Sequence, residues 1–130
     1  MRMHHLGVAT HDAQQTAGLL GELLGATQCH SEQFDGLDIR FLRIENGFVE
    51  LLEPIENGTV ARFLERRGPG IHHIGLEPED IDVALAQAAD LGIERIDESP
   101  RPGAWGHDVA FLHPGDTGGV LIEFVAERSK

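Results

Sequence analysis

Apolar positions recur with the period of a helix in two segments of the chain, and each segment follows an aspartate. The steps between them are four, three and four residues after Asp12, and four, three and three after Asp80. These positions are Ala13, Ala17, Leu20 and Leu24 in the first segment, and Ile81, Leu85, Ala88 and Leu91 in the second. Aspartate before such a run is typical of an N-cap, and glycine after it, as at Gly25 and Gly92, is typical of a helix end. The pattern predicts two amphipathic helices.

The segments around both helices alternate between apolar and polar residues, which is the period of a strand. One strand is expected before each helix, in MHHLGVAT and in IHHIGLE. The strands expected after the helices are 27–30, 37–44 and 48–54 in the first half, and 94–96, 107–114 and 119–125 in the second. Asn46-Gly47 between two alternating runs indicates a hairpin. Each half therefore predicts the element order βαβββ.

The two halves are an internal repeat, because an offset of 68 residues places His5 on His73 and Asp12 on Asp80. Between them we expect a short connecting helix, capped by Thr59. The predicted fold class is α+β, with two tandem βαβββ modules packed together and curved mixed sheets forming a metal-binding cleft. We expect a single domain of residues 1–130, with module one at about 1–58, a connector at 59–70 and module two at 71–128.

Alternation along the strands selects one face of each sheet as the candidate site. In both His-His pairs only one imidazole points away from the predicted helix, and the small residues at Gly7 and Gly75 leave that face open. We expect His5 and His73 on the open face, with His4 and His72 on the helix side in structural roles. The last strand of each half carries one carboxylate in an apolar run, and these are Glu50 and Glu123.

Two histidines and two glutamates make a donor set for a divalent cation of intermediate hardness, such as Co²⁺, Ni²⁺, Zn²⁺ or Mn²⁺. The four residues also fit an alternative, in which each His–Glu pair is hydrogen-bonded and holds no metal. The single cysteine, Cys29, excludes an internal disulfide and a cysteine-based metal site.

The formal net charge is −12, and Lys130 is the only lysine. We expect neither nucleic acid nor an anionic membrane as a partner, because both attract clusters of Lys and Arg. A surface so acidic indicates a halophilic protein, since high salt screens the self-repulsion. No apolar run reaches the roughly 18 residues of a membrane span, and the N-terminus lacks a signal-peptide pattern. We therefore expect a cytoplasmic protein.

The residues also resemble a known family. The segments that carry the resemblance are HHLGVATHD, VELLEP, GPGIHHIGLEPEDI, ESPRPGAWGHDVAFLHP and TGGVLIEF. Together with the repeat, they resemble the vicinal oxygen chelate superfamily of glyoxalases, bleomycin resistance proteins and dioxygenases. Within it, the pattern is most similar to the methylmalonyl-CoA epimerase family. The resemblance runs from His5 to about Val125, and the acidic surface is similar to that of members from salt-loving archaea.

The resemblance implies a metal-dependent epimerase. Such an enzyme interconverts the (R) and (S) forms of methylmalonyl-CoA by moving the proton at C2 through an enolate. The family's metal ligands fall on His5, Glu50, His73 and Glu123, with cobalt the expected ion. Glu123 is the favoured group for proton transfer, with Glu50 as a second group. Some family members carry a further catalytic glutamate where this chain has Ile39 or Arg40, so His107 and His113 also enter as acid/base candidates.

The remaining expectations concern the substrate and the partners. We expect an acyl-CoA substrate, bound with the help of Arg101, Trp105 and His113. Arg101 would meet a carboxylate or a CoA phosphate, and Trp105 lies in a glycine-containing loop that would cover the cleft. A homodimer is expected because members of this scaffold often form dimers. Two alternative functions stay open: a glyoxalase I-like lyase or isomerase acting on a thiol adduct, and a non-catalytic module that binds a small molecule.

Overall fold

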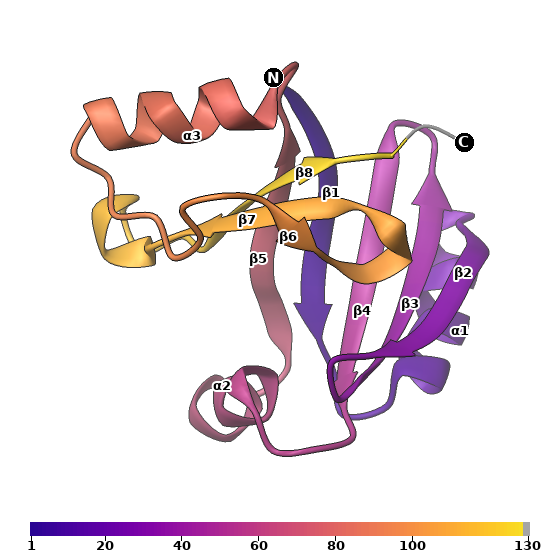
Figure 1. Ribbon diagram of the computed structural model, residues 1–130. Helices are drawn as coiled ribbons and strands as arrows, with labels where there is room; N and C mark the ends of the chain where they lie inside the picture. The colour runs from indigo at the N-terminus through magenta and orange to yellow at the C-terminus, as the bar shows by residue number, and fades with distance from the viewer. Residues whose placement is uncertain (129–130) are drawn as a thin grey trace. The chain divides into compact units, whose positions relative to one another are not determined.

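The computed structural model describes residues 1–128, and the chain divides into two units (Figure 1). The first unit is residues 5–72. The second unit consists of residues 1–4 together with the described residues from 73 onward. Each unit contains a long helix and strands in the predicted order, which confirms the βαβββ fold class.

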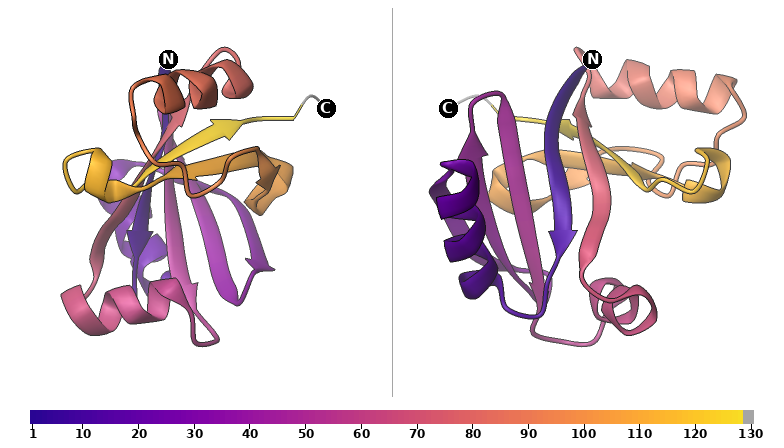
Figure 2. Two further views of the ribbon diagram at one scale, coloured as in Figure 1. Left: turned by 60° about the vertical axis from the view of Figure 1, so that its left-hand side comes forward. Right: turned by 180° about the vertical axis from the view of Figure 1, so that it is seen from behind.

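The first unit is a mixed sheet covered on one face by a helix. Its elements are β1 (Arg2–Ala9), α1 (Ala13–Leu24), β2 (Thr27–Phe34), β3 (Leu37–Ile44), β4 (Gly47–Pro54) and α2 (Thr59–Arg67). The strand order is β2-β3-β4-β1, with β1 parallel to β4 and the other pairs antiparallel. Helix α1 lies along β3 and β4 (Figure 2). It packs Ala13 and Ala17 against Leu42, Val49 and Leu51.

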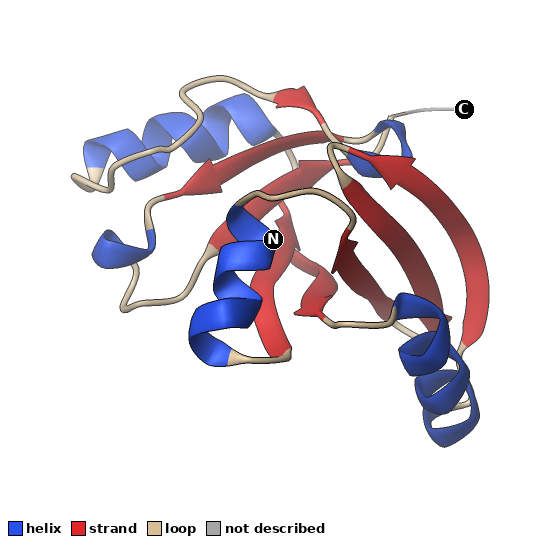
Figure 3. Cartoon of the chain, turned by 90° about the horizontal axis from the view of Figure 1, so that it is seen from below, coloured by secondary structure: helices blue, strands red, loops and turns tan. Residues whose placement is uncertain are grey.

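The second unit repeats this arrangement. It contains part of β5 (Gly70–Glu77), α3 (Ile81–Asp90), β6 (Arg101–Pro102), β7 (Asp108–Leu112) and β8 (Ile122–Ala126). The strand order is β5-β8-β7-β6, with β5 parallel to β8. Its core consists of Ala84, Leu85, Ala88, Ala110, Leu112 and Phe124. Two short helical turns, η1 (Ala104–Gly106) and η2 (Pro114–Asp116), precede and follow β7 (Figure 3).

The helix caps follow the predicted chemistry in two helices out of three. The Asp12 carboxylate accepts a hydrogen bond from the Gln15 N–H, and the Asp80 carboxylate accepts bonds from the N–H groups of Asp82 and Val83. The predicted cap at Thr59 is wrong, because Gly58 occupies the N-cap position of α2 and Thr59 is already helical.

The strand β2 is longer than predicted because its hairpin turn lies further along the chain. Asp35 and Gly36 both have positive φ, 53° and 74°, and they close a two-residue turn between β2 and β3. Asp-Gly is a favoured pair for such turns, because both positions require the left-handed region. The hairpin predicted between 37–44 and 48–54 is confirmed, but its two-residue turn is Glu45-Asn46, because Gly47 is already in β4 and pairs with Ile44.

The strand predicted at 94–96 is wrong. The segment forms an isolated bridge from Arg95 to Leu112, with backbone N–H groups of residues 96 and 97 donating to the Phe111 carbonyl, and β6 is instead the strand between α3 and β7. The Asp97 carboxylate accepts the Phe111 N–H at 2.9 Å, so a side chain takes the place of a ladder carbonyl there. The other late strands are shifted or shortened relative to the predictions, to 108–112 and 122–126. No helix among residues 1–128 combines the length and apolarity that crossing a membrane requires.

The core under α1 makes a testable prediction for stability. Leu51 is fully buried, so Leu51→Ala should lower the free energy of unfolding by about 2–5 kcal/mol through lost contacts and a cavity. Leu19 lies on α1 but is 66% exposed. Leu19→Ala should therefore change the free energy of unfolding by no more than about 0.5 kcal/mol. Urea unfolding of both variants measures the difference, and equal losses would contradict this assignment of the core.

Candidate functional site

The first unit places His5 and Glu50 together on the sheet face that α1 does not cover. The His5 Nε2 lies 3.2 Å from the Glu50 Oε1, and both side chains are buried. The neighbours of Glu50 on β4, Val49 and Leu51, pack against α1 on the other face. In the ladders, Gly7 lies beside Glu50 on one side and Phe41 on the other. The face predicted by strand alternation is therefore confirmed for this pair.

The second unit places His73 and Glu123 in the same way. The His73 Nε2 lies 3.6 Å from the Glu123 Oε1, and both side chains are again buried. Gly75 on β5 and Phe111 on β7 are the ladder partners of Glu123. Phe124, the next residue on β8, packs in the core beside α3. Each unit thus contains a His–Glu pair flanked by a glycine and a phenylalanine.

Aromatic rings orient the imidazole in both pairs. The His5 ring meets Phe41 edge to face at 6.1 Å and 77°, and the His73 ring meets Phe111 at 5.7 Å and 78°. Such packing restricts ring rotation and keeps the imidazole directed at its carboxylate. Neither phenylalanine was predicted for the site from the sequence. They lie opposite the glutamates in the antiparallel ladders. Predicting them would have required the strand register, which periodicity alone does not give.

A buried carboxylate is costly unless positive charge or hydrogen bonds compensate it. A neutral imidazole supplies little charge, so a His–Glu pair either shares a proton or binds a cation. Imidazole nitrogen and carboxylate oxygen together suit zinc, cobalt, nickel and manganese. The donor chemistry of both pairs therefore fits a divalent metal.

Arg101 contacts the ring of Phe111, which in turn contacts His73 of the His73–Glu123 pair. Its Nε donates to the Asp97 Oδ1 at 2.9 Å, and its guanidinium lies 5.6 Å from the centroid of the Phe111 ring. The other neighbour of that ring is His73. The Arg101 side chain is 46% exposed, so it meets solvent while packing beside the site residues.

The loop before β7 folds onto a histidine. Trp105 has the left-handed φ of 61°, and its ring packs on His107 with centroids 5.5 Å apart. His107 is buried and meets the ring of His4 at 5.4 Å. The two histidines predicted to be structural also have ring partners, because the His72 ring lies 5.0 Å from Phe63 of α2.

His113 lies in the turn after β7. The His113 Nδ1 accepts a hydrogen bond from the Gly115 N–H at 3.1 Å. The backbone N–H of His113 donates to the Glu94 carbonyl at 2.8 Å. These contacts give it a role in shaping the η2 turn. The part predicted for it in substrate binding stays a prediction.

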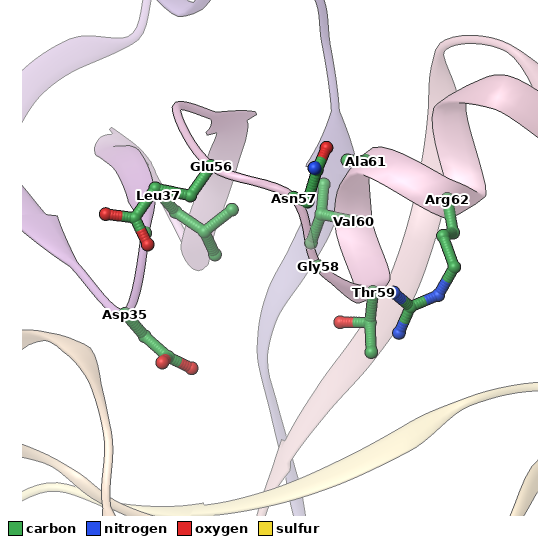
Figure 4. Close-up of a pocket in the computed structure, with 10 residues that line it drawn as sticks. Asp35, Leu37, Glu56, Asn57, Gly58, Thr59, Val60, Ala61 and Arg62 are labelled. Carbon is green, nitrogen blue, oxygen red and sulfur yellow. The ribbon is translucent and has the colours of Figure 1, made fainter.

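The first unit also contains a polar cavity of about 270 Å³, between the β2–β3 turn and the start of α2. Asp35, Leu37 and Glu56 lie across it from Thr59 and Arg62 (Figure 4). None of the residues predicted for the site lines it. It is therefore separate from the His–Glu pair of this unit.

Comparison with known proteins identifies the family. A family model for the glyoxalase/bleomycin resistance protein/dioxygenase superfamily matches residues 4–111, which is most of the chain. The chain belongs to this superfamily. Membership and the His–Glu pairs together point to a divalent metal site, without identifying the metal.

Within the superfamily, the chain is similar to several proteins named as epimerases. It is 37% identical over 129 residues to the ethylmalonyl-CoA/methylmalonyl-CoA epimerase of Cereibacter sphaeroides, covering 94% of this chain and 95% of that protein. It is 32% identical over 126 residues to the mitochondrial methylmalonyl-CoA epimerase of Homo sapiens, covering 94% and 72%. A variant of the Streptomyces coelicolor methylmalonyl-CoA epimerase, solved in complex with 2-nitronate-propionyl-CoA, has a TM-score of 0.94 at 31% identity, covering 99% and 96%.

The contacts around Phe111 make a prediction for stability. Asp97→Ala should lower the free energy of unfolding by about 1–3 kcal/mol, because it removes the acceptor of a partly buried N–H. Asp108→Ala is the matched control: it removes an exposed ion pair with Arg128 and should cost no more than about 1 kcal/mol. Urea unfolding compares the two variants. A cost for Asp108→Ala as large as that for Asp97→Ala would argue against this role of Asp97.

Proposed function

We propose that this chain is a metal-dependent epimerase that interconverts the (R) and (S) forms of methylmalonyl-CoA. The observation that carries the proposal is the buried His–Glu pair that recurs at matched positions of both units. Family membership and the epimerases among the relatives support the reaction class. The Cereibacter sphaeroides relative is named for both ethylmalonyl-CoA and methylmalonyl-CoA, so both belong among the substrates to be tested.

We assign the metal ligands to both pairs, His5 with Glu50 and His73 with Glu123. Nitrogen and oxygen donors of this kind suit a divalent cation that keeps open positions for substrate oxygens, and cobalt is the ion we expect. A bound divalent cation supplies a Lewis acid, which stabilises negative charge that develops on the oxygens of the substrate. We also propose that residues 1–130 act as a single functional domain.

The proton at C2 is the atom that the chain must move. The carbon C2 lies between a thioester and a carboxylate, so loss of its proton gives an enolate-like carbanion. Return of a proton to the other face inverts the centre. This requires a base on one face and an acid on the other. We propose Glu123 for one face and Glu50 for the other. Two groups of the same kind suit a reaction that runs in both directions, because the base of one direction is the acid of the other.

Arg101 is the residue we propose for a carboxylate or phosphate of the substrate. Its guanidinium packs on Phe111, which also contacts His73, and its side chain is partly exposed. Guanidinium groups bind such anions through paired hydrogen bonds. Trp105 and His113 are proposed to contact the CoA ester from the loops on either side of β7.

Four further expectations accompany this proposal as predictions. These are cobalt as the ion in the cell, a homodimer, a cytoplasmic location and adaptation to high salt. The last follows from the net charge of −12, which salt would screen.

Deuterium exchange tests the reaction. The protein is purified in high salt, stripped with a chelator and reloaded with Co²⁺, then incubated with methylmalonyl-CoA in D₂O. We expect deuterium at C2, detected by mass spectrometry, at a rate well above that of the stripped protein, because removing the ion removes charge stabilisation. His73→Ala should behave like the stripped protein.

The outcomes of this experiment separate the alternatives. If Co²⁺ binds and no deuterium enters methylmalonyl-CoA or ethylmalonyl-CoA, the substrate is wrong, and thiol adducts of the glyoxalase type are tested next. If the protein binds no metal and exchanges no proton, a non-catalytic binding module is favoured.

Matched substitutions test the two proton-transfer groups. Glu123→Gln and Glu50→Gln each keep an oxygen donor and remove the base, so each should lower the rate of epimerisation by about 10²–10⁴-fold. With two groups, each variant should still exchange the C2 proton of one stereoisomer and lose exchange of the other. Exchange is followed from each pure stereoisomer, with metal content measured alongside. Unchanged exchange of both stereoisomers in Glu50→Gln would move the second group elsewhere, with His107 next.

A further inference from the structure

A second group of metal-binding side chains lies in the second unit, outside the four residues assigned above. It consists of His4 on β1, His107 just before β7, and Glu127 just after β8. Each offers one ligand atom, and these atoms lie within 4.8 Å of one another. The His4 Nε2 lies 2.6 Å from the Glu127 Oε2. Three segments far apart in the sequence thus bring two imidazoles and a carboxylate together.

The burial of this group is unusual for a chance surface cluster. His4 is 1% exposed and His107 is 7% exposed, whereas the Glu127 side chain is 28% exposed. Buried polar side chains need a hydrogen bond or a metal ion to compensate for the loss of water. Glu127 is thus the member of the group that meets solvent.

We propose that His4, His107 and Glu127 bind a second divalent metal ion. Two imidazoles and one carboxylate are a ligand set of the zinc type, with a fourth position left for water. Co²⁺, Ni²⁺ and Cu²⁺ suit the same donors, while Mg²⁺ and Ca²⁺, which favour oxygen ligands, do not. This site shares no ligand with the four residues assigned to the epimerase metal.

The donors must adjust their positions to hold an ion. Ligands about 2.0–2.1 Å from a tetrahedral ion lie about 3.3 Å from one another. The present His4–Glu127 contact is shorter, so the carboxylate must withdraw slightly to admit an ion. Glu127 is suited to this, because it follows the end of β8 and is the most exposed member. The imidazoles are held by each other, with rings at 87°, and His107 also by Trp105.

Two arginines near Glu127 form hydrogen bonds with other carboxylates. Arg2, which is within electrostatic reach of Glu127, forms its hydrogen bonds with Glu77, and these raise its pKa. Arg128 bonds to Asp108, which likewise raises its pKa. The bound ion would tie the start of β1 to the segments flanking β7 and β8. Because binding favours the folded state alone, the ion would raise the thermal stability of the protein.

The experiment counts Co²⁺ in four proteins: the parent, His73→Ala, His107→Phe and the double variant. His107→Phe keeps an aromatic ring against His4 and Trp105 but removes both nitrogens. After equilibrium dialysis and elemental analysis, we expect about two equivalents in the parent, one in each single variant and none in the double variant, from one ion per set of donors. Circular dichroism verifies that each variant is folded.

Trp105, the only tryptophan of the chain, gives a second readout at this site. In the His73→Ala protein, Co²⁺ should quench its emission and raise the melting temperature. Glu127→Gln, which alters a partly exposed side chain, should weaken that binding by at least about tenfold, since even residues that only support a ligand change affinity by 10–100-fold.

Two results would overturn the proposal. One is a His107→Phe protein that binds as much Co²⁺ as the parent. The other is a His73→Ala protein that binds none and shows no quenching of Trp105. Neither result depends on epimerase activity, so failure here is distinguishable from failure of the proposed reaction.

Discussion

In each unit, the structure depends on burying a carboxylate beside an imidazole on the sheet face turned away from the helix. Strand alternation makes this possible, because Val49 and Leu51 pack under α1 while Glu50, between them, faces the other way. The spacing that builds the core is therefore the spacing that positions the donors. A change in register by one residue would place the carboxylate in the apolar core and the apolar residues beside the histidine.

The glycines and phenylalanines beside the two glutamates complete this arrangement. Gly7 and Gly75 share the face of the carboxylates in the parallel ladders, and a side chain there would stand directly beside the donor atoms. On the opposite side, Phe41 and Phe111 pack against the imidazoles. Each glutamate thus has a glycine beside it in one ladder and a phenylalanine in the other.

Much of this could be predicted from the sequence, because it rests on local periods. The helices at Asp12 and Asp80 and the faces of His5 and His73 follow from repeat spacing and capping chemistry. The features that were not predicted depend on contacts between residues far apart in the sequence. The carboxylate of Asp97 takes the N–H of Phe111 where a strand was expected. His4 was assigned a structural role, and only the folded chain shows that residues before β7 and after β8 surround it.

The division of β1 between the units affects how the protein is made. Residues 5–72 emerge from the ribosome as one continuous stretch, so the first unit can assemble while the rest is being translated. The second unit cannot, because its first four residues must wait for the last strand. The contact of His4 with Glu127 spans 123 positions of the chain. Closing so long a loop is slow, so the N-terminal end of β1 is set in place only after β8 and Glu127 have been made.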